Sequence, residues 1–508
     1  MTNLARSIGG NWLLNLLQLA AVLVLSPYVL GQLGADLNGA WVAIVSWTGI
    51  LSLLVLGVPM TAVRFAGAEA ARGDEAAFQR VISTVQQVLV GLACAALVTG
   101  TGLWLWFGER WLTSPEAQVL SEAQRSDARL AFALIVVQVS FAFVLRLPYG
   151  ILEARRDFLA RNALMAGEVL LRTGLTLACL AWRPELSTLA GVLVVTLACE
   201  ALVTRAVLRK RHPQVRLSFS GADRSLWRPL LNYSVFVLLL NVGALLAFRV
   251  DAIVISTHLP PSEATWFDFG NKFFDPLAGL LIAVGAVVMP YAAHLATQSS
   301  STELQAVFLR WSKVCTLVSL LVLVYLITVG QAFLTVWAGP EVGRRSSEVL
   351  QVLCFGFLLY LPVRGVAVPV LMGSGSPRIP AIAMVVTGAL NLGLSWWLVQ
   401  THGIVGVAWG TAIPNTLFAA WVLPEACRRS GTTTAVYVRQ VLAPQWLAAG
   451  IIGTLLWFTV QHLQPSTWLE VVGLGILEVL LFASVWLGLV WRGDAHLDTR
   501  AWMSKLRP

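Results

Sequence analysis

Apolar stretches of about 20 residues recur along almost the whole chain, from Asn11 to Trp491, with no long polar segment between them. A helix needs about 20 predominantly apolar residues to cross a hydrocarbon core of roughly 30 Å. Of the 508 residues, 57% are hydrophobic and 12% are charged, whereas soluble domains carry roughly 25% charged residues. No core in water could bury this much apolar surface, so the sequence predicts a polytopic membrane protein without a sizeable extramembrane domain.

The apolar stretches predict an all-α integral membrane fold of about fourteen transmembrane helices. The first six are expected at 10–32, 38–67, 79–108, 129–152, 160–182 and 187–208. A second series of six is expected at 230–256, 265–295, 310–337, 347–372, 379–400 and 403–424, and a final pair at 441–462 and 468–491. The first stretch runs on to Leu30, which is too long for a signal-peptide core, so it is predicted to be a helix that is not cleaved.

Lysine and arginine residues in the loops indicate the orientation. With a cytoplasmic N-terminus, 23 of the 35 basic residues fall in cytoplasmic loops and 6 in loops on the other side. Cytoplasmic loops carry the excess of positive charge in membrane proteins. Both termini are therefore predicted to be cytoplasmic, in an inner membrane. The same loops explain the net charge of +9, so nucleic-acid binding is not expected.

The longest basic loop, from Arg205 to Arg228, divides the predicted helices after the sixth. Two blocks of similar length result, and Asn11 and Asn232 open them at corresponding positions. Repeated helix blocks are typical of transporters. The expected organisation is an N-lobe at 1–212, a C-lobe at 213–427, and a terminal helix pair with a cytoplasmic tail at 428–508.

Enzyme motifs are not found in the sequence. The six cysteines lie within spans or at their ends without a CxxC pair, which indicates neither disulfides nor a metal site. The segment 373–378, Gly-Ser-Gly-Ser-Pro-Arg, lacks the lysine of a phosphate loop and is predicted to be a turn between two helices. A polytopic enzyme such as a polysaccharide polymerase would need catalytic residues on a sizeable aqueous loop. The longest outer loop, from Gly108 to Arg129, is short and has no histidine, so the chain is predicted not to be an enzyme.

Charged residues inside the predicted spans are the candidates for function, because each costs about 2.5–3.5 kcal/mol at the bilayer centre. The cations are Arg64, Arg146, Arg172, Arg249, Lys272 and Arg364, and the acids are Glu168, Glu200, Asp251, Asp268, Asp275 and Glu478. Their equal numbers also fit purely structural ion pairs. Glu168 and Arg172 are four residues apart and share a helix face. By the same spacing, one face of the helix at 265–295 is expected to hold Asp268, Lys272 and Asp275.

Depth in the membrane separates these residues into two groups. Arg64, Arg146 and Arg364 are expected in the cytoplasmic half, with Arg172 near the middle. The outer half is expected to hold Arg249, Asp251, Asp268, Lys272 and Asp275. Arg64 and Arg146 are close enough to the cytoplasmic ends to reach the interface with their side chains, which is the structural alternative for them.

Three short segments resemble a known family. Residues 401–413, Thr-His-Gly-Ile-Val-Gly-Val-Ala-Trp-Gly-Thr-Ala-Ile, preceded by Asn391-Leu392, are similar to the GxxGxAxxT pattern of the Wzx-type oligosaccharide flippases. These belong to the multidrug/oligosaccharidyl-lipid/polysaccharide exporter (MOP) superfamily. Residues 251–255, Asp-Ala-Ile-Val-Ile, resemble a second family segment, although Ala-Thr-Trp follows at 264–266 where the family usually has Val-Gly-Tyr. Residues 56–59, Leu-Gly-Val-Pro, before Arg64 resemble the third.

The resemblance implies two six-helix lobes around a central cavity and flipping of polyprenyl-diphosphate-linked oligosaccharide from the cytoplasmic to the periplasmic leaflet. Arginine presents a fork of donors that suits phosphate oxygens, so the expected diphosphate ligands are Arg64, Arg146, Arg172 and Arg364. The expected ion-coupling residues are Asp251, Asp268, Asp275, Lys272, Arg249 and Glu168, with H⁺ or Na⁺ as the ion and no other cofactor. Polysaccharide polymerase and export proteins are the expected partners. The alternatives are a lipid-II flippase or a small-molecule antiporter of the same superfamily.

Overall fold

The computed structural model describes residues 2–55, 58–219, 221–227, 242–243, 246, 250–297, 301–491, 494 and 497. These residues are overwhelmingly helical and none of them forms a strand, which confirms the predicted all-α fold. In the described part of the chain, 11 helical runs are long and apolar enough to cross a membrane. Two of these runs contain a glycine with non-helical backbone angles, Gly34 and Gly403, and each holds two of the predicted spans. The span predicted at 230–256 lies largely outside the described residues.

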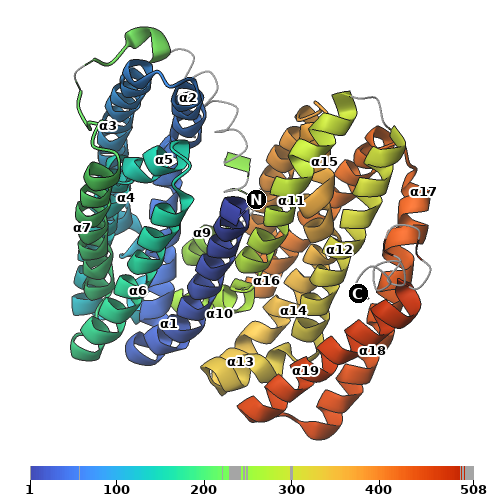
Figure 1. Ribbon diagram of the computed structural model, residues 1–508. Coiled ribbons are helices and arrows are strands. Elements are labelled where there is room, and N and C mark those ends of the chain that lie inside the picture. Colours follow the sequence, from blue (N-terminus) through green and yellow to red (C-terminus); the bar gives the residue numbers. More distant parts are fainter. Residues whose placement is uncertain are drawn as a thin grey trace. The chain divides into compact units, whose positions relative to one another are not determined.

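The chain forms two compact units, and each is described here by itself (Figure 1). The first unit contains Met1–Leu245 together with Ile255–Thr265, and the second contains Leu246–Val254 and Trp266–Pro508. The lobe boundaries predicted after residues 212 and 427 stay predictions.

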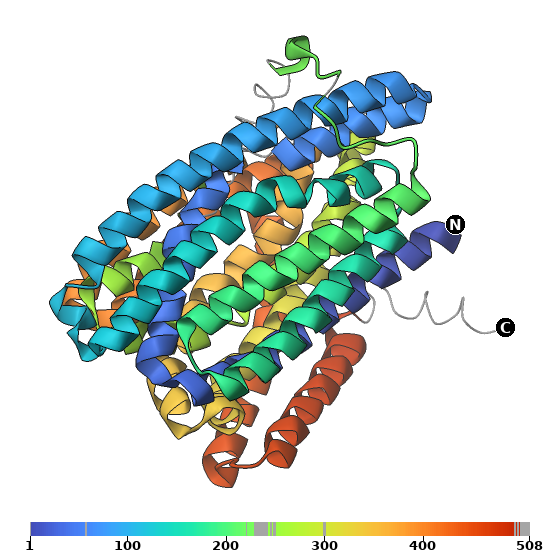
Figure 2. The ribbon, with the colours of Figure 1, turned by 90° about the vertical axis from the view of Figure 1, so that its left-hand side faces the viewer.

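The first unit is a helix bundle (Figures 1 and 2). Its helices are α1 (Thr2–Gly49), α2 (Val58–Arg72), α3 (Glu75–Trp106), α4 (Glu122–Leu145), α5 (Leu147–Ala154), α6 (Phe158–Trp182) and α7 (Leu186–Arg211). Helix α4 packs between α3 and α7, and α6 packs against α1 and α7. Local sequence sets the helix starts: the Asp74 carboxylate accepts the Ala77 N–H at 2.8 Å, and Ser121 with Gln124 forms a capping box.

Residues 255–265 belong to the first unit because hydrogen bonds from α1 and from Trp111, which follows α3, hold them there. The Asn38 amide donates to Thr265 Oγ1 at 3.1 Å, and the Thr265 hydroxyl donates to the Ala35 carbonyl at 2.7 Å. At Gly39 the backbone approaches so closely that an added Cβ would lie 1.7 Å from the Pro261 oxygen. Only glycine fits at this contact.

The second unit is also helical (Figure 1). It contains residues 250–254 of α9 (Val250–His258) and residues 266–271 of α10 (Pro261–Asn271). Its other helices are α11 (Phe274–Thr297), α12 (Ser301–Thr328), α13 (Gly330–Ala338), α14 (Pro340–Pro362), α15 (Val368–Gly373), α16 (Arg378–Arg429), α17 (Thr434–Tyr437), α18 (Ala443–Leu463) and α19 (Trp468–Val485). Helix α14 packs against α12 and α16 and carries the largest buried share of the spans. The predicted terminal helix pair, α18 and α19, packs on α12 through an apolar cluster that includes Val324, Ile452 and Trp486.

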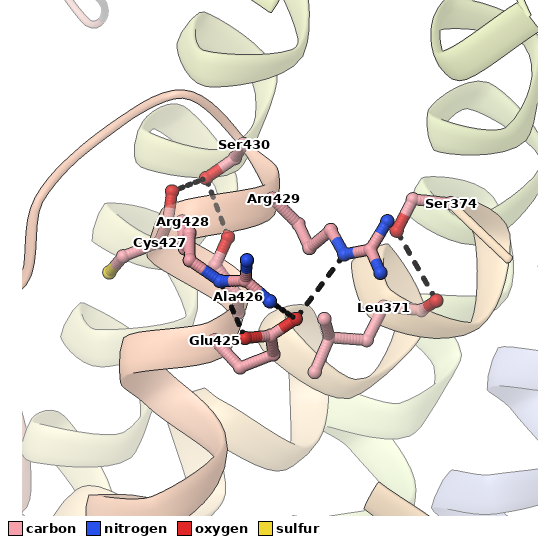
Figure 3. Close-up of polar contacts among 8 residues, drawn as sticks. All are labelled: Leu371, Ser374, Glu425, Ala426, Cys427, Arg428, Arg429 and Ser430. Atoms are coloured by element: carbon pink, nitrogen blue, oxygen red, sulfur yellow. Dashed lines mark hydrogen bonds and ion pairs between the residues drawn. The ribbon is translucent and has the colours of Figure 1, made fainter. Parts of the chain in front are cut away.

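Helix α16 is a hairpin of two helices that meet at Gly403. Gly403 has φ 57 and ψ −139, which only glycine adopts without strain. The C-terminal end of the hairpin lies beside the turn that follows α15 (Figure 3). There the Ser374 N–H donates to the Val370 carbonyl, which confirms the predicted turn at 373–378. At the other end, Glu425 forms ion pairs with Arg428 at 2.7 Å and with Arg429 at 3.2 Å.

Candidate functional site

A cavity of about 530 Å³ lies within the first unit and is lined by charged side chains. Its charged residues are Arg146, Arg161 and Arg172 with Glu153, Glu168 and Glu200. They come from α5, α6, α7 and the junction between α4 and α5. Arg146 and Arg172, predicted from the sequence as phosphate ligands, are thus brought together in one site, and Glu168 lies with them.

Local sequence explains how these side chains reach the cavity. Arg146 is the single residue between α4 and α5, and Pro148 at the start of α5 lacks the N–H that would continue α4. The chain therefore breaks at Arg146. On α6, Arg161, Glu168 and Arg172 are spaced seven and four residues apart, which places them on one helix face.

Each arginine of this cavity faces one carboxylate. Arg146 Nη2 lies 3.3 Å from Glu200 Oε2, Arg161 Nε lies 3.4 Å from Glu153 Oε2, and Arg172 Nη1 lies 3.7 Å from Glu168 Oε1. The distances exceed the 2.7–2.9 Å of a strong charge-assisted hydrogen bond. The side chains of Arg146 and Arg172 are 49% and 37% exposed. The cavity is charge-balanced, but its ion pairs are loose and accessible.

Two further cavities adjoin this one in the first unit. A cavity of about 310 Å³ shares Arg146 with it, and one of about 440 Å³ between α6 and α7 shares Glu168 and Glu200. Both adjoining cavities are lined mainly by apolar residues. We call the charged cavity of about 530 Å³ the arginine cavity, defined by Arg146, Arg161, Arg172 and their three carboxylates.

Two other predicted phosphate ligands lie elsewhere in the structure. Arg64 belongs to α2, next to Val63, which lines the arginine cavity, but the Arg64 side chain lies outside the described part. Arg364 belongs to the second unit, in a π-helical turn, Val363–Ala367, directly after Pro362. Such turns are frequent at functional sites. Arg364 is partly exposed, whereas Val363 and Gly365 beside it are buried.

Asp251 forms a second site, in the second unit. It lies on α9 and is 3% exposed. The Thr411 hydroxyl donates to Asp251 Oδ2 at 2.8 Å, and the Ser395 hydroxyl donates to Oδ1 at 3.5 Å. Ser395 Oγ also lies 3.4 Å from the Val407 carbonyl, and the Asn391 amide donates to Thr411 Oγ1 at 2.8 Å. We call this group, which consists of Asp251, Asn391, Ser395, Val407 and Thr411, the aspartate site.

The hairpin of α16 assembles the aspartate site. Ser395 and Asn391 come from its first helix, and Thr411 comes from its second. Gly410 lets the two helices touch, since an added Cβ there would lie 2.2 Å from Ser395 Oγ and 2.7 Å from its backbone nitrogen. The glycine-rich segment 401–413, which carried the strongest sequence resemblance, therefore builds the hairpin that surrounds Asp251.

The other predicted ion-coupling residues form a separate group. Asp268 and Lys272 are an ion pair, and the Lys272 ammonium lies 5.4 Å from the centre of the Phe269 ring. Asp275 is exposed. The helix expected at 265–295 is interrupted at residues 272–273, so Asp275 does not continue the face that carries Asp268. The interruption is explained by Pro276, which clashes with the carbonyl four residues earlier.

Arg249 lies outside the described residues. The hydrogen bonds of Asp251 in the described part of the chain come from α16.

Several site residues were missed in the sequence. Neither Arg161 nor Glu153 was among the candidate residues. The spacing of Arg161 to Glu168 and Arg172 on one helix face was the signal that could have found it. Ser395 carried no signal, because hydroxyl residues are common in membrane helices. Asn391 and Thr411 stood within the resembling segments without an assigned role.

The comparisons with known proteins agree with this architecture. A family model described as polysaccharide biosynthesis protein matches residues 4–296. No curated protein matches the chain. Among solved structures, an inward-facing MATE-family multidrug transporter of the MOP superfamily has 14% identity and a TM-score of 0.68, covering 82% of this chain and 98% of that one.

Two more solved structures are similar. The lipid II flippase MurJ in an inward closed conformation has 14% identity and a TM-score of 0.68, covering 95% of this chain and 98% of its own. A MOP-superfamily transporter from Pyrococcus furiosus, whose binding pocket is described as having reverse polarity, has 14% identity and a TM-score of 0.55. The match covers 84% of this chain and 95% of that one. At this identity the likeness shows the fold, which this chain shares with these multi-pass membrane proteins. Because the family model spans more than half of the sequence, the chain belongs to the polysaccharide biosynthesis protein family.

Proposed function

We propose that the protein flips a polyprenyl-diphosphate-linked oligosaccharide from the cytoplasmic to the periplasmic leaflet of the inner membrane, driven by an ion gradient. The arginine cavity is the observation that carries this proposal. It gathers three guanidinium groups inside one helical unit of a chain that belongs to a polysaccharide biosynthesis family. Both termini face the cytoplasm in this proposal.

The chemistry of the head group explains why arginines are needed. A diphosphate carries about two negative charges and cannot cross hydrocarbon without cationic partners. The guanidinium fork matches phosphate oxygens in two parallel hydrogen bonds. Arg146 and Arg172 are the principal ligands in this proposal. Arg161 is a third from the same cavity, and Arg64 and Arg364 are further contacts during the transport cycle.

The carboxylates of the arginine cavity keep it stable before substrate arrives. An unpaired cation inside a membrane protein is costly, so each arginine needs a partner when the head group is absent. Glu200 and Glu168 supply this charge at 3.3 and 3.7 Å. The contacts are long enough for phosphate oxygens to replace them without breaking a tight bidentate pair. Binding of the head group then exchanges the carboxylate partner of each arginine for a phosphate. When no substrate is bound, the carboxylates keep each arginine paired.

The aspartate site supplies the coupling to an ion gradient. Asp251 is buried, and all of its described hydrogen-bond partners are neutral groups. Its neighbours are hydroxyl, amide and carbonyl oxygens, and such oxygen ligands suit hard cations. H⁺ or Na⁺ bound there would neutralise the carboxylate. In this proposal the Asp268–Lys272 pair is structural, since each group already has an opposite charge.

Transport then follows alternating access, in which the two lobes rock around the bound head group while the polyprenyl tail stays in lipid. The alternatives differ only in cargo. A lipid-II flippase would use the same arginines for the same diphosphate, whereas an antiporter of cationic drugs would gain nothing from them.

A reconstituted flipping assay tests the proposal. Liposomes carry the transporter and a fluorescent polyprenyl-diphosphate oligosaccharide, and arrival at the opposite leaflet is measured under a Na⁺ or H⁺ gradient. Arg146→Gln with Arg172→Gln should lower the rate by at least about tenfold, since each charge-assisted hydrogen bond is worth about 1.5–3 kcal/mol.

The charge-matched control is Arg110→Gln with Arg183→Gln, which removes two exposed arginines outside the arginine cavity. It should keep the wild-type rate. Equal rates in all three proteins would exclude the arginine cavity as the head-group site. Transport of a cationic dye in place of the diphosphate lipid would establish the drug-antiporter alternative.

A further inference from the structure

A second basic cavity lies in the first unit, at the C-terminal end of α7 and apart from the arginine cavity. Its volume is about 390 Å³. Its lining includes Arg205, Arg209 and Arg216 together with Leu208, Val215 and Leu217, and no acidic residue lines it. The arginines come from two different segments: Arg205 and Arg209 from α7, and Arg216 from the strap, which we define as residues 212–219. The strap leaves α7 and runs along α3 (Figure 1).

The strap is held in place on α3, so the cavity has fixed walls. The Gln79 side chain donates to the Arg216 carbonyl at 2.5 Å and accepts the Arg216 N–H at 3.0 Å. The Gln87 amide donates to the Phe219 carbonyl at 3.3 Å. Val215, 5% exposed, packs in the apolar core of the unit. These contacts fix the backbone of Arg216 opposite the face of α7 that carries the other two arginines.

The three arginines have no acidic partner in the part of the chain that the structure describes, where no ion pair joins them to a carboxylate. Arg205 and Arg209 are four residues apart and lie on one face of α7. Arg211, on the same last turn, is paired with Asp157 at 2.6 Å. The local acid is therefore already engaged, and three positive charges surround a cavity without a counter-charge. Such an arrangement attracts an anion.

The length of α7 places this cavity at the level of lipid head groups. The helix has 26 residues, or about 39 Å at 1.5 Å per residue, whereas the hydrocarbon core is roughly 30 Å thick. The helix is thus about 9 Å longer than the hydrocarbon. Its last turn holds Arg209, Lys210 and Arg211, whose charge favours placing this end beyond the hydrocarbon. Leu202, which is 70% exposed, precedes Arg205 by three residues and lies on the same helix stripe. An apolar surface on the membrane side thus adjoins the cationic cavity.

We propose that this cavity binds the phosphate-bearing head group of an anionic membrane phospholipid. The three guanidinium groups bind the phosphate oxygens, and an acyl chain lies along Leu202. A free phosphate would need only the arginines, and the adjoining exposed apolar stripe favours the lipid. Basic pockets at this depth in membrane proteins suit anionic lipid head groups. The bound lipid would tie the strap to the membrane surface. The proposal does not depend on the transported cargo.

Lipid binding to the purified full-length protein tests this site. The delipidated protein in detergent is titrated with phosphatidylglycerol or cardiolipin by native mass spectrometry. Phosphatidylcholine, a zwitterion without net charge, is the reference. Replacing Arg205, Arg209 and Arg216 by Gln should weaken binding of the anionic lipids by at least about tenfold. The control replaces Arg110, Arg183 and Lys210 by Gln, which removes the same charge from exposed positions outside the cavity, and should stay within about twofold.

A matched pair of single variants covers the case in which the triple variant does not fold. Arg209→Gln should weaken binding about threefold or more, and its neighbour Lys210→Gln should leave it unchanged. Equal binding in Arg209→Gln and wild type would overturn the site. Displacement of the lipid by millimolar inorganic phosphate would overturn the lipid assignment, because it would identify a site for free phosphate.

Discussion

The arginine cavity of the first unit and the aspartate site of the second unit differ in how their charged groups are paired and how far they are exposed. In the arginine cavity three cations face three carboxylates at 3.3–3.7 Å, and two of the arginine side chains are at least 37% exposed. In the aspartate site a single carboxylate is 3% exposed and its described hydrogen bonds come from neutral hydroxyl groups.

The difference indicates which ligand each site would accept. A loose, accessible ion pair lets an incoming anion take the place of a carboxylate at little cost. A buried carboxylate without a cationic partner is costly, and a bound cation removes that cost. In the proposed function, the anion site and the cation site are therefore separate, one in each unit.

Asp251→Asn should have the largest effect. The change removes the only formal charge of the aspartate site and keeps the shape of the side chain. A bound cation would lose several charge-assisted contacts of about 1.5–3 kcal/mol each, so gradient-driven transport should fall by about 100-fold or more. Flipping in proteoliposomes under an imposed gradient measures this.

Asp268→Asn is the control for this prediction, since it makes the same chemical change at a carboxylate that Lys272 already neutralises. Partly exposed ion pairs are worth about 0–1 kcal/mol, so transport should fall by less than about fivefold. A large loss in Asp268→Asn with normal transport in Asp251→Asn would move the cation site to the Asp268–Lys272 pair.

Gly410→Ala should disturb the aspartate site through its scaffold. The added methyl would lie 2.2 Å from Ser395 Oγ and 2.7 Å from its backbone nitrogen, so the two helices of the α16 hairpin must separate. Overpacking of this kind costs about 1–3 kcal/mol, which thermal unfolding in detergent detects.

The control is Gly393→Ala, on the first helix of the same hairpin. An added Cβ there meets open space, so this variant should not lower the melting temperature. An equal melting temperature for both variants would show that the hairpin contact at Gly410 is dispensable.

Glu200→Gln should have the smallest effect, and it should strengthen substrate binding instead of weakening function. Without this carboxylate, Arg146 loses its competing anion, so affinity for a polyprenyl diphosphate should rise about two- to fivefold. Binding in detergent, compared with an uncharged polyprenol, measures this. A weaker affinity would mean that Glu200 positions Arg146 instead of competing for it.

Much of this architecture could be predicted because apolar periodicity and charge are explicit in the sequence. The all-α fold followed from the recurring apolar stretches, and Arg146, Arg172, Glu168 and Asp251 were recognised as charges inside spans. The turn at 373–378 followed from its glycine and proline. These features depend on local sequence and on the cost of placing charge in a membrane.

Other features depend on contacts between distant segments and could not be predicted. Ser395 contributes to the aspartate site only because Gly410 brings a second helix against it. The partner of Arg146 is Glu200, 54 residues away, and no spacing rule connects them. The break before α11 was missed because the apolar pattern continues through it, although Pro276 was a local signal.

The separation of the two sites is tested most directly by measuring both ligands on the same pair of variants. Purified wild type, Asp251→Asn, and Arg146→Gln with Arg172→Gln are each titrated with a polyprenyl diphosphate and, in a separate series, with Na⁺ and with acid to follow cation uptake. Asp251→Asn should lose cation uptake and keep its affinity for the diphosphate within about twofold of wild type. The arginine double variant should keep cation uptake and lose at least about tenfold in diphosphate affinity. If both variants lose both ligands, or if neither variant loses the ligand assigned to its site, the account of an anion site in one unit and a cation site in the other is wrong.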